Sequence, residues 1–147
     1  MASVVVIDSG VLLGTVLQEK WTPKAKALLV QLEHQQVQLM APILARYEVV
    51  SVMRKAVWQE RLTADEGTEA LTKLLNYSIE FRVDDMLLRR AYELATRFNR
   101  PTAYDSQYLA LAERLDCPLW TADERLFNAV HNDLAWVQWV GHFTDAP

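Results

Sequence analysis

Cysteine and histidine are scarce in this sequence, and their scarcity excludes several kinds of site. One cysteine, Cys117, occurs among 147 residues, so the chain has no partner for an internal disulfide. Because Cys117 lies in an apolar stretch before a proline, a small buried residue is a better interpretation than a reactive thiol. The three histidines, at positions 34, 131 and 142, are scattered, so no cysteine and histidine cluster indicates a zinc site.

Long hydrophobic runs and long polar linkers are also absent. No segment approaches the roughly 20 apolar residues that span a bilayer, and the apolar run at the N-terminus is too short for a signal peptide. We therefore expect a cytoplasmic protein without a membrane segment. Hydrophobic residues make up 51% of the chain, which predicts one folded domain over 1–147. The net charge of −4 argues weakly against a general nucleic-acid coat protein.

Short apolar runs alternate with stretches of helical periodicity. Strands are expected at 4–7, 37–40, 79–83, 118–120 and 136–140. Helices are expected at 9–18, around 23–32, and at 42–61, 64–76, 84–99, 102–115 and 123–131. The most apolar runs, 4–7 and 118–120, predict central strands, and the alternating run 79–83 predicts an edge strand. This order favours an α/β fold in which helices cover both faces of a parallel sheet, with ligands at the carboxyl ends of the strands.

Three aspartates stand where such a sheet would bring them together. Asp8 ends the first strand, Asp123 follows the strand at 118–120, and Asp105 lies in the first turn of the helix before that strand. Helix capping is the structural alternative for each of them. Asp8 and Asp123 are in positions typical of N-caps, and Asp105 could form a capping box with Thr102.

Glu48 is harder to explain as a structural residue, because it lies inside a helix and not at its end. Leu44 and Val52, at helical spacing, place it on an apolar stripe, where a carboxylate is costly unless it is paired. An ion pair from elsewhere in the fold is the alternative. Converging carboxylates repel one another, and a divalent cation relieves that repulsion. An all-oxygen set without histidine favours Mg²⁺ or Mn²⁺ over zinc.

Four segments carry a resemblance to one family. Residues 4–9 read VVVIDS, residues 46–52 read RYEVVSV, residues 103–113 read AYDSQYLALAE and residues 120–126 read WTADERL. They resemble the four motifs of PIN domains, and the third is closest to the VapC-type version. The third and fourth motifs at this separation are specific, whereas the first alone is weak and the second is the least specific.

The resemblance implies a three-layer α/β/α fold with a central five-stranded parallel sheet. It implies an Mg²⁺- or Mn²⁺-dependent endoribonuclease that hydrolyses RNA, commonly the toxin of a toxin–antitoxin pair and commonly a homodimer. Carried over by position, the catalytic and metal-binding residues would be Asp8, Glu48, Asp105 and Asp123. Ser9 and Thr121 match the hydroxyl positions that support such a site. The hypothesis is that bound metal activates a water for in-line attack and leaves a 5′-phosphate and a 3′-hydroxyl.

Basic and aromatic residues are the candidates for contacts with RNA or protein. Most of the arginines are typical of solvated helix faces, but Arg97 and Arg100, just before the Asp105 helix, are expected to contact RNA. Trp21 and Trp58 flank helices and suit an exposed dimer or antitoxin surface. The other tryptophans, which lie in strand candidates, are expected in the core; they are Trp120, Trp136 and Trp139.

Two other functions remain open from the sequence. The same carboxylates would serve a metal-dependent nuclease that acts on single-stranded or structured DNA. A non-catalytic α/β interaction domain is the second alternative, in which the carboxylates only cap helices. Cleavage assays on RNA and DNA distinguish the first alternative, and Mn²⁺-dependent thermal stabilisation distinguishes the second.

Overall fold

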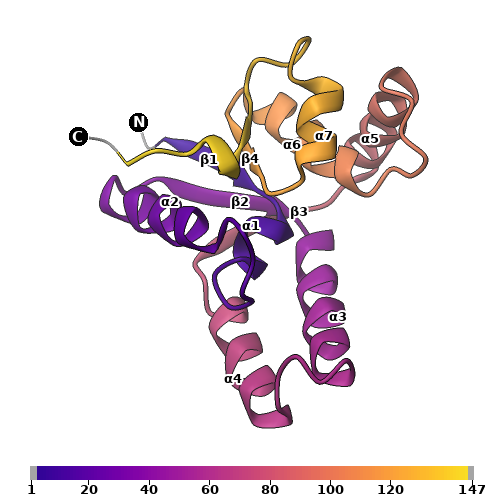
Figure 1. The fold of residues 1–147 in the computed structure, drawn as a ribbon. Coiled ribbons are helices and arrows are strands. Elements are labelled where there is room, and N and C mark those ends of the chain that lie inside the picture. Colours follow the sequence, from indigo (N-terminus) through magenta and orange to yellow (C-terminus); the bar gives the residue numbers. More distant parts are fainter. Residues whose placement is uncertain (1–2, 146–147) are drawn as a thin grey trace.

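The computed structural model describes residues 3–145, which form a parallel β-sheet between two layers of helices (Figure 1). The strands follow the order β3-β2-β1-β4-β5, and each pairing of neighbours is parallel. Their bounds are Val4–Ile7 for β1, Gln38–Pro42 for β2, Ile79–Arg82 for β3, Leu119–Thr121 for β4 and Val137–Trp139 for β5. The predicted three-layer α/β/α fold with a central five-stranded parallel sheet is confirmed, with β3 at one edge as expected.

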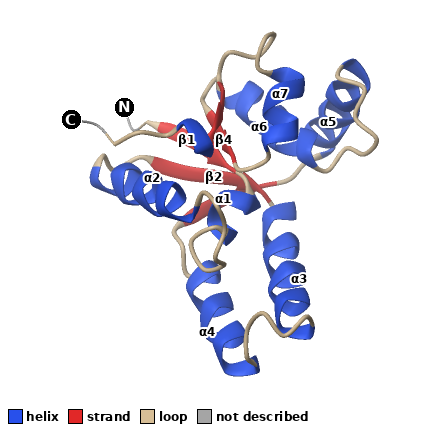
Figure 2. Cartoon of the chain, in the orientation of Figure 1, coloured by secondary structure: helices blue, strands red, loops and turns tan. Residues whose placement is uncertain are grey.

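Helices connect the strands and cover both faces of the sheet (Figure 2). Their bounds are Ser9–Leu13 for α1, Thr22–His34 for α2, Leu44–Trp58 for α3, Ala64–Leu75 for α4, Asp85–Arg97 for α5, Asp105–Leu115 for α6 and Glu124–Val130 for α7, with a short 3-10 helix η1 at Val140–His142. None of the helices formed by residues 3–145 has the length and apolarity needed to cross a bilayer.

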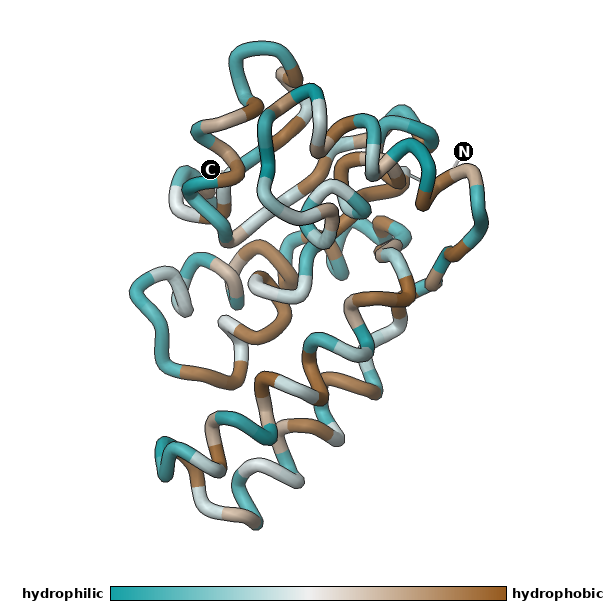
Figure 3. Tube along the Cα trace, turned by 90° about the vertical axis from the view of Figure 1, so that its right-hand side faces the viewer, coloured by the Kyte–Doolittle hydropathy of each residue, from teal (hydrophilic) through white to brown (hydrophobic). Residues whose placement is uncertain are grey.

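Alternation along β1 divides the hydrophobic core into two parts. Val5 and Ile7 belong to the part that α1, α2, α3 and α4 enclose, whereas Val6 belongs to the part under α5, α6 and α7. Beyond the sheet, α3 and α4 project together as a pair (Figure 1). Hydrophobic and hydrophilic residues alternate along these two helices in Figure 3, as expected for helices with one buried side.

The chain reverses its direction of travel across the sheet at β1. From β1 it proceeds to β2 and β3 on one side, and it then returns to form β4 and β5 on the other. The carboxyl ends of β1 and β4 therefore meet at a topological switch point, where open α/β sheets form their ligand-binding crevices. Asp8 follows β1 directly, and Asp123 lies two residues beyond Thr121, which ends β4.

Several helix ends follow the sequence, and others differ from the prediction. Thr63 and Glu66 form the expected capping box at the start of α4. The first helix ends at Leu13 instead of residue 18, because the chain turns after its cap at Gly14. Residues 101–104 do not form the start of α6, and the helix begins at Asp105 instead of residue 102. The last residue of β2 is Pro42, which was expected to open α3.

Candidate active site

Asp8 is a buried carboxylate that three donors hold in place. Its Oδ1 accepts a hydrogen bond of 3.0 Å from the backbone N–H of Val11, so Asp8 is the N-cap of α1. The backbone N–H of Ala122 lies 3.3 Å from both carboxylate oxygens, and the Thr121 hydroxyl donates to Oδ2. Burial is the dominant influence and raises the pKa of Asp8 from 3.8 to about 7, although these hydrogen bonds oppose it.

Thr121 connects two of the predicted site residues. The side chain of Thr121 is fully buried at the end of β4, where its hydroxyl donates to Asp8 and accepts 2.9 Å from the backbone N–H of Asp123. Asp123 in turn caps α7, because its Oδ1 accepts 3.1 Å from the backbone N–H of Leu126. A single threonine thus positions both the Asp8 carboxylate and the backbone that carries the Asp123 carboxylate.

Glu48 is held by hydroxyl groups and not by a cation. Its Oε1 accepts 3.1 Å from the Ser9 hydroxyl and 2.5 Å from the Tyr108 hydroxyl. The Tyr108 oxygen itself accepts 3.3 Å from the backbone N–H of Ser9. No ion pair of Glu48 is found within residues 3–145, so the alternative of an ion pair from elsewhere in the fold is not supported there. Its negative charge remains uncompensated at the half-buried end of this network.

Asp105 does not cap a helix through its side chain. The cap of α6 is Tyr104, which makes no side-chain capping bond, so the proposed capping box with Thr102 is wrong. Burial and the negative charges of Asp123 and Glu48 raise the pKa of Asp105. The guanidinium of Arg100, 4.0 Å from Asp105 Oδ2, opposes that rise.

These carboxylates therefore belong to one electrostatic unit, which we call the acidic site. Asp105 interacts with each of the other three. Its negative charge contributes to the raised pKa of Asp8, and the negative charges of Asp123 and Glu48 contribute to the raised pKa of Asp105. The acidic site consists of Asp8, Glu48, Asp105 and Asp123. A concentration of negative charge with oxygen donors attracts hard cations such as Mg²⁺ and Mn²⁺.

Tyr108 is a residue of this site that the sequence did not identify. It is almost fully buried, and its hydroxyl joins Ser9 to Glu48. Burial and the charge of Glu48 raise its pKa, so the hydroxyl keeps its proton and remains a donor to Glu48. A signal was present in its position three residues after Asp105, on a helix that begins at the carboxyl ends of the strands.

The residues predicted to contact RNA or protein lie at different places relative to the acidic site. Arg100 lies beside Asp105, whereas Arg97 packs over the ring of Phe98, with its guanidinium carbon 4.8 Å from the ring centroid. Trp58 is 71% exposed, in agreement with its predicted surface position. Trp21 is not exposed as expected but packs against the core beside Gly14, where an added Cβ would lie 3.1 Å from the indole nitrogen.

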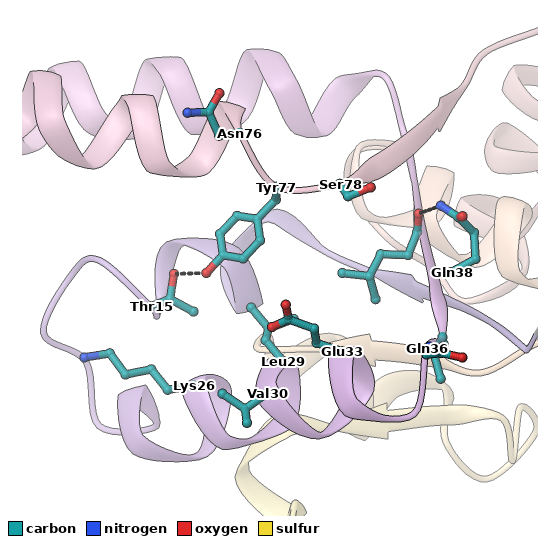
Figure 4. Close-up of a pocket in the computed structure, with 12 residues that line it drawn as sticks. Thr15, Lys26, Leu29, Val30, Glu33, Gln36, Gln38, Asn76, Tyr77 and Ser78 are labelled. Atoms are coloured by element: carbon teal, nitrogen blue, oxygen red, sulfur yellow. Dashed lines mark hydrogen bonds between the residues drawn. The ribbon is translucent and has the colours of Figure 1, made fainter.

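A cavity of about 720 Å³ lies apart from the acidic site (Figure 4). It is enclosed by α2 and by the segment that leads from α4 into β3, and the Tyr77 hydroxyl donates 3.3 Å to Thr15 inside it. Its lining includes Gln38, the first residue of β2, and Ser78, which precedes β3. The cavity is therefore at the amino ends of these strands, and none of its lining residues belongs to the acidic site.

Comparison with known proteins identifies similar chains and folds. A family model described as PIN domain matches residues 6–133. The chain is 35% identical over 88 residues to VapC ribonuclease Mb0985 of Mycobacterium bovis, which covers 60% of this chain and 67% of that protein. It is 37% identical over 86 residues to ribonuclease VapC1 of Mycobacterium tuberculosis, which covers 58% of this chain and 63% of that protein.

A solved structure supports the same architecture. The crystal structure of PAE2754 from Pyrobaculum aerophilum superimposes with a TM-score of 0.68 and covers 96% of this chain and 93% of the other. Because the two sequences are only 20% identical, this similarity supports the fold alone.

Proposed function

Because this chain belongs to the PIN-domain family, in its VapC-type branch, we propose that it is a metal-dependent endoribonuclease and the toxin of a toxin–antitoxin pair. The names of the similar mycobacterial proteins support RNA as the substrate. One observation carries the proposed chemistry: the acidic site gathers repelling carboxylates at the switch point of the sheet, where Asp105 has a raised pKa.

The acidic site fits Mg²⁺ or Mn²⁺ by donor type and charge. Its donors are carboxylate oxygens, which both ions prefer, and a cation would offset the burial and the repulsion that together raise the pKa of Asp105. Within residues 3–145, no three acidic, histidine or cysteine side chains are already gathered around one point. Binding would therefore draw carboxylates of the acidic site closer together. Asp8 and Asp105 are our first choices as direct ligands.

The residues in and around the acidic site have separate roles in the proposed reaction. Thr121 and the backbone N–H of Ala122 fix the orientation of the Asp8 carboxylate. Ser9 and Tyr108 hold Glu48 through the same oxygen, which leaves its other oxygen available to a ligand or a water molecule. When bound, the cation supplies an activated water and neutralises charge on the scissile phosphate. Glu48 and Asp123 are proposed to orient that water, so that hydrolysis leaves a 5′-phosphate and a 3′-hydroxyl.

A pair of substitutions separates metal binding from helix capping. Asp105→Asn removes a charge from the acidic site, and Asp84→Asn removes a charge from an aspartate that caps α5 through Leu87 N–H. Wild type and both variants would be melted with increasing Mn²⁺ after removal of all other metal. We expect Mn²⁺ to raise the melting temperature of wild type and Asp84→Asn, with a much smaller rise for Asp105→Asn, because binding stabilises the folded state by mass action.

Cleavage assays on matched RNA and DNA strands complete the test. We expect cleavage of single-stranded RNA that requires the metal, survives Asp84→Asn and is lost in Asp105→Asn. Preferential cleavage of DNA would contradict the proposed ribonuclease activity and indicate a deoxyribonuclease. The metal-site proposal is wrong if Asp8→Asn and Asp105→Asn leave both Mn²⁺ binding and cleavage intact.

Protein partners form the second part of the proposal, together with a cytoplasmic location. Exposed apolar side chains follow one side of α3, where Tyr47, Val50 and Trp58 are 68%, 46% and 71% exposed. Exposed apolar side chains along one side of a helix support contact with a second copy of the chain or with an antitoxin. Sedimentation of wild type and Trp58→Arg tests the homodimer. We expect a dimer that the substitution weakens, and a monomeric wild type at micromolar concentration contradicts it.

A further inference from the structure

The segment between α5 and α6 places two side chains beside Asp105. Asn99 adopts a left-handed backbone, with φ of 52°, as the chain leaves α5. The backbone N–H of Arg100 then donates 2.8 Å to the carbonyl oxygen of Ala95, which fixes the path of the chain at this point. Arg100 therefore lies in a turn that is tied to the end of α5, and Tyr104 follows at the start of α6.

Tyr104 is an exposed aromatic residue at the edge of the acidic site. Its side chain is 59% exposed, and it immediately precedes Asp105. Its backbone is helical, with φ of −68° and ψ of −55°, so it lies one turn before Tyr108 on the same side of α6. Tyr108 contacts Glu48 from that side. Within residues 3–145 the Tyr104 ring makes no ring contact or side-chain hydrogen bond.

Arg100 supplies positive charge at the same edge. Its side chain is 21% exposed, and its guanidinium approaches Asp105 at 4.0 Å, the limit of an ion pair. No other ion pair of Arg100 is found in the described part of the chain. Within that part of the chain, its guanidinium therefore has no competing ion pair when an anion approaches the acidic site.

We propose that Tyr104 and Arg100 form a nucleotide subsite, in which the Tyr104 ring stacks on a base and Arg100 binds a phosphate next to the scissile bond. This inference rests on the proposed ribonuclease function and assigns a position to the substrate strand. Proteins that bind single strands combine cationic side chains with aromatic stacking surfaces, because every base offers a ring face. Tyr104 contacts the substrate strand away from the reacting atoms, so its role is substrate binding.

Binding of modified strands tests the stacking contact without cleavage. Single-stranded RNA oligonucleotides, each with an abasic nucleotide at a different position, would be bound to the full chain in EDTA. We expect one position at which loss of the base weakens binding by wild type by roughly five- to a hundred-fold. Tyr104→Ala should weaken binding of the intact strand by a similar factor and abolish the effect of that abasic position. Tyr104→Phe should restore both, because the ring and not the hydroxyl makes the contact.

Tyr92→Ala is the matched control, because Tyr92 is 71% exposed on α5 and lies outside the acidic site. It should bind every strand as wild type does. With metal present, Tyr104→Ala should raise KM with little change in kcat. If Tyr104→Ala and Tyr92→Ala bind the intact and abasic strands with equal affinity, the stacking contact is refuted.

The salt dependence of binding tests Arg100. Because each neutralised phosphate of a single strand contributes about 0.7 to the slope of log affinity against log salt, Arg100→Gln should reduce that slope by about 0.7. Arg89→Gln, which removes the same charge from an exposed position on α5, should leave it unchanged. Equal slopes for the two variants overturn the phosphate contact. If wild type cleaves RNA and Tyr104→Ala binds and cleaves it equally well, the subsite alone is refuted. If wild type neither binds nor cleaves RNA, the proposed function is refuted as well.

Discussion

Replacement of Asp8 by asparagine should stabilise the metal-free protein at alkaline pH. Asparagine keeps the cap of α1, because its side-chain oxygen can still accept from the backbone N–H of Val11. It removes a carboxylate whose burial raises its pKa from 3.8 to about 7. If Asp8 serves the proposed function, this substitution improves stability while it impairs activity, as a trade-off between stability and activity predicts.

The magnitude follows from the difference in pKa between the folded and unfolded chains. Below about pH 4 the Asp8 carboxyl is protonated in both states and causes no loss of stability. As the pH rises from about 4 to about 7, the carboxyl ionises in the unfolded chain but stays protonated in the native state, which by about pH 7 has lost at most about 4 kcal/mol of stability. The asparagine variant escapes this loss, but the hydroxyl proton of Thr121 loses its carboxylate acceptor, which costs about 1–2 kcal/mol. The variant should therefore be less stable than wild type at pH 4 and about 2–3 kcal/mol more stable at pH 8.

Urea unfolding of both proteins in EDTA, at pH 4 and pH 8, measures this change of sign. Asp84→Asn is the control with the opposite expectation, because the hydrogen bond from Arg114 lowers the pKa of Asp84. Its charge stabilises the native state above the usual aspartate pKa, and this stabilisation fades as the pH falls through the lowered value. Asp84→Asn should therefore be destabilising at both pH 8 and pH 4, without a change of sign, and less so only at pH values near the lowered pKa. A stability difference for Asp8→Asn that is the same at both pH values would refute the reasoning.

Three further substitutions test the surroundings of the site and the helical pair. Tyr108→Phe should cost about 1–2 kcal/mol in urea unfolding and slow RNA cleavage, because Glu48 loses its 2.5 Å hydrogen bond; unchanged cleavage would contradict a role for this contact. Gly67→Ala should cost about 1–3 kcal/mol in thermal melts, because the new Cβ would clash with Val57 Cγ2 at the contact of α3 with α4. A second substitution, Val57→Ala, should recover part of that loss. Thr63→Ala should cost about 1 kcal/mol through the lost cap of α4, and a loss confined to Gly67→Ala would show that the cap contributes nothing.

The sequence predicts the sheet well, because its strands are short apolar runs between clear turns. Val4–Ile7 was expected as a central strand and occupies the middle of the sheet. Helix ends were harder to predict where tertiary contacts decide them. Residues 102–104 have a helical pattern, but the chain after Pro101 reaches helical geometry only at Tyr104. Trp21 flanks a helix and was expected at the surface, yet Gly14 leaves room for its ring against the core.

The acidic site was visible in part from local patterns. Glu48 was identified because a carboxylate on an apolar stripe needs a partner, but the sequence could not name that partner. Ser9 and Tyr108 provide it from positions 39 and 60 residues away, and the pairing depends on how α1, α3 and α6 pack. Asp105 was separated from its capping alternative only by the geometry at the start of α6. Local periodicity predicts which face a residue occupies, whereas contacts between distant segments follow from the fold.

The metal dependence of RNA cleavage tests the central proposal most directly. Wild type and Asp105→Asn, freed of metal, would be incubated with an end-labelled single-stranded RNA in EDTA, Mg²⁺ or Mn²⁺, and the ends of the products would be determined. We expect wild type to cleave only with a divalent cation, to leave 5′-phosphate and 3′-hydroxyl ends, and to lose this activity in Asp105→Asn. Cleavage in EDTA, cyclic phosphate ends, or full activity of Asp105→Asn would contradict a metal-dependent hydrolysis at the acidic site.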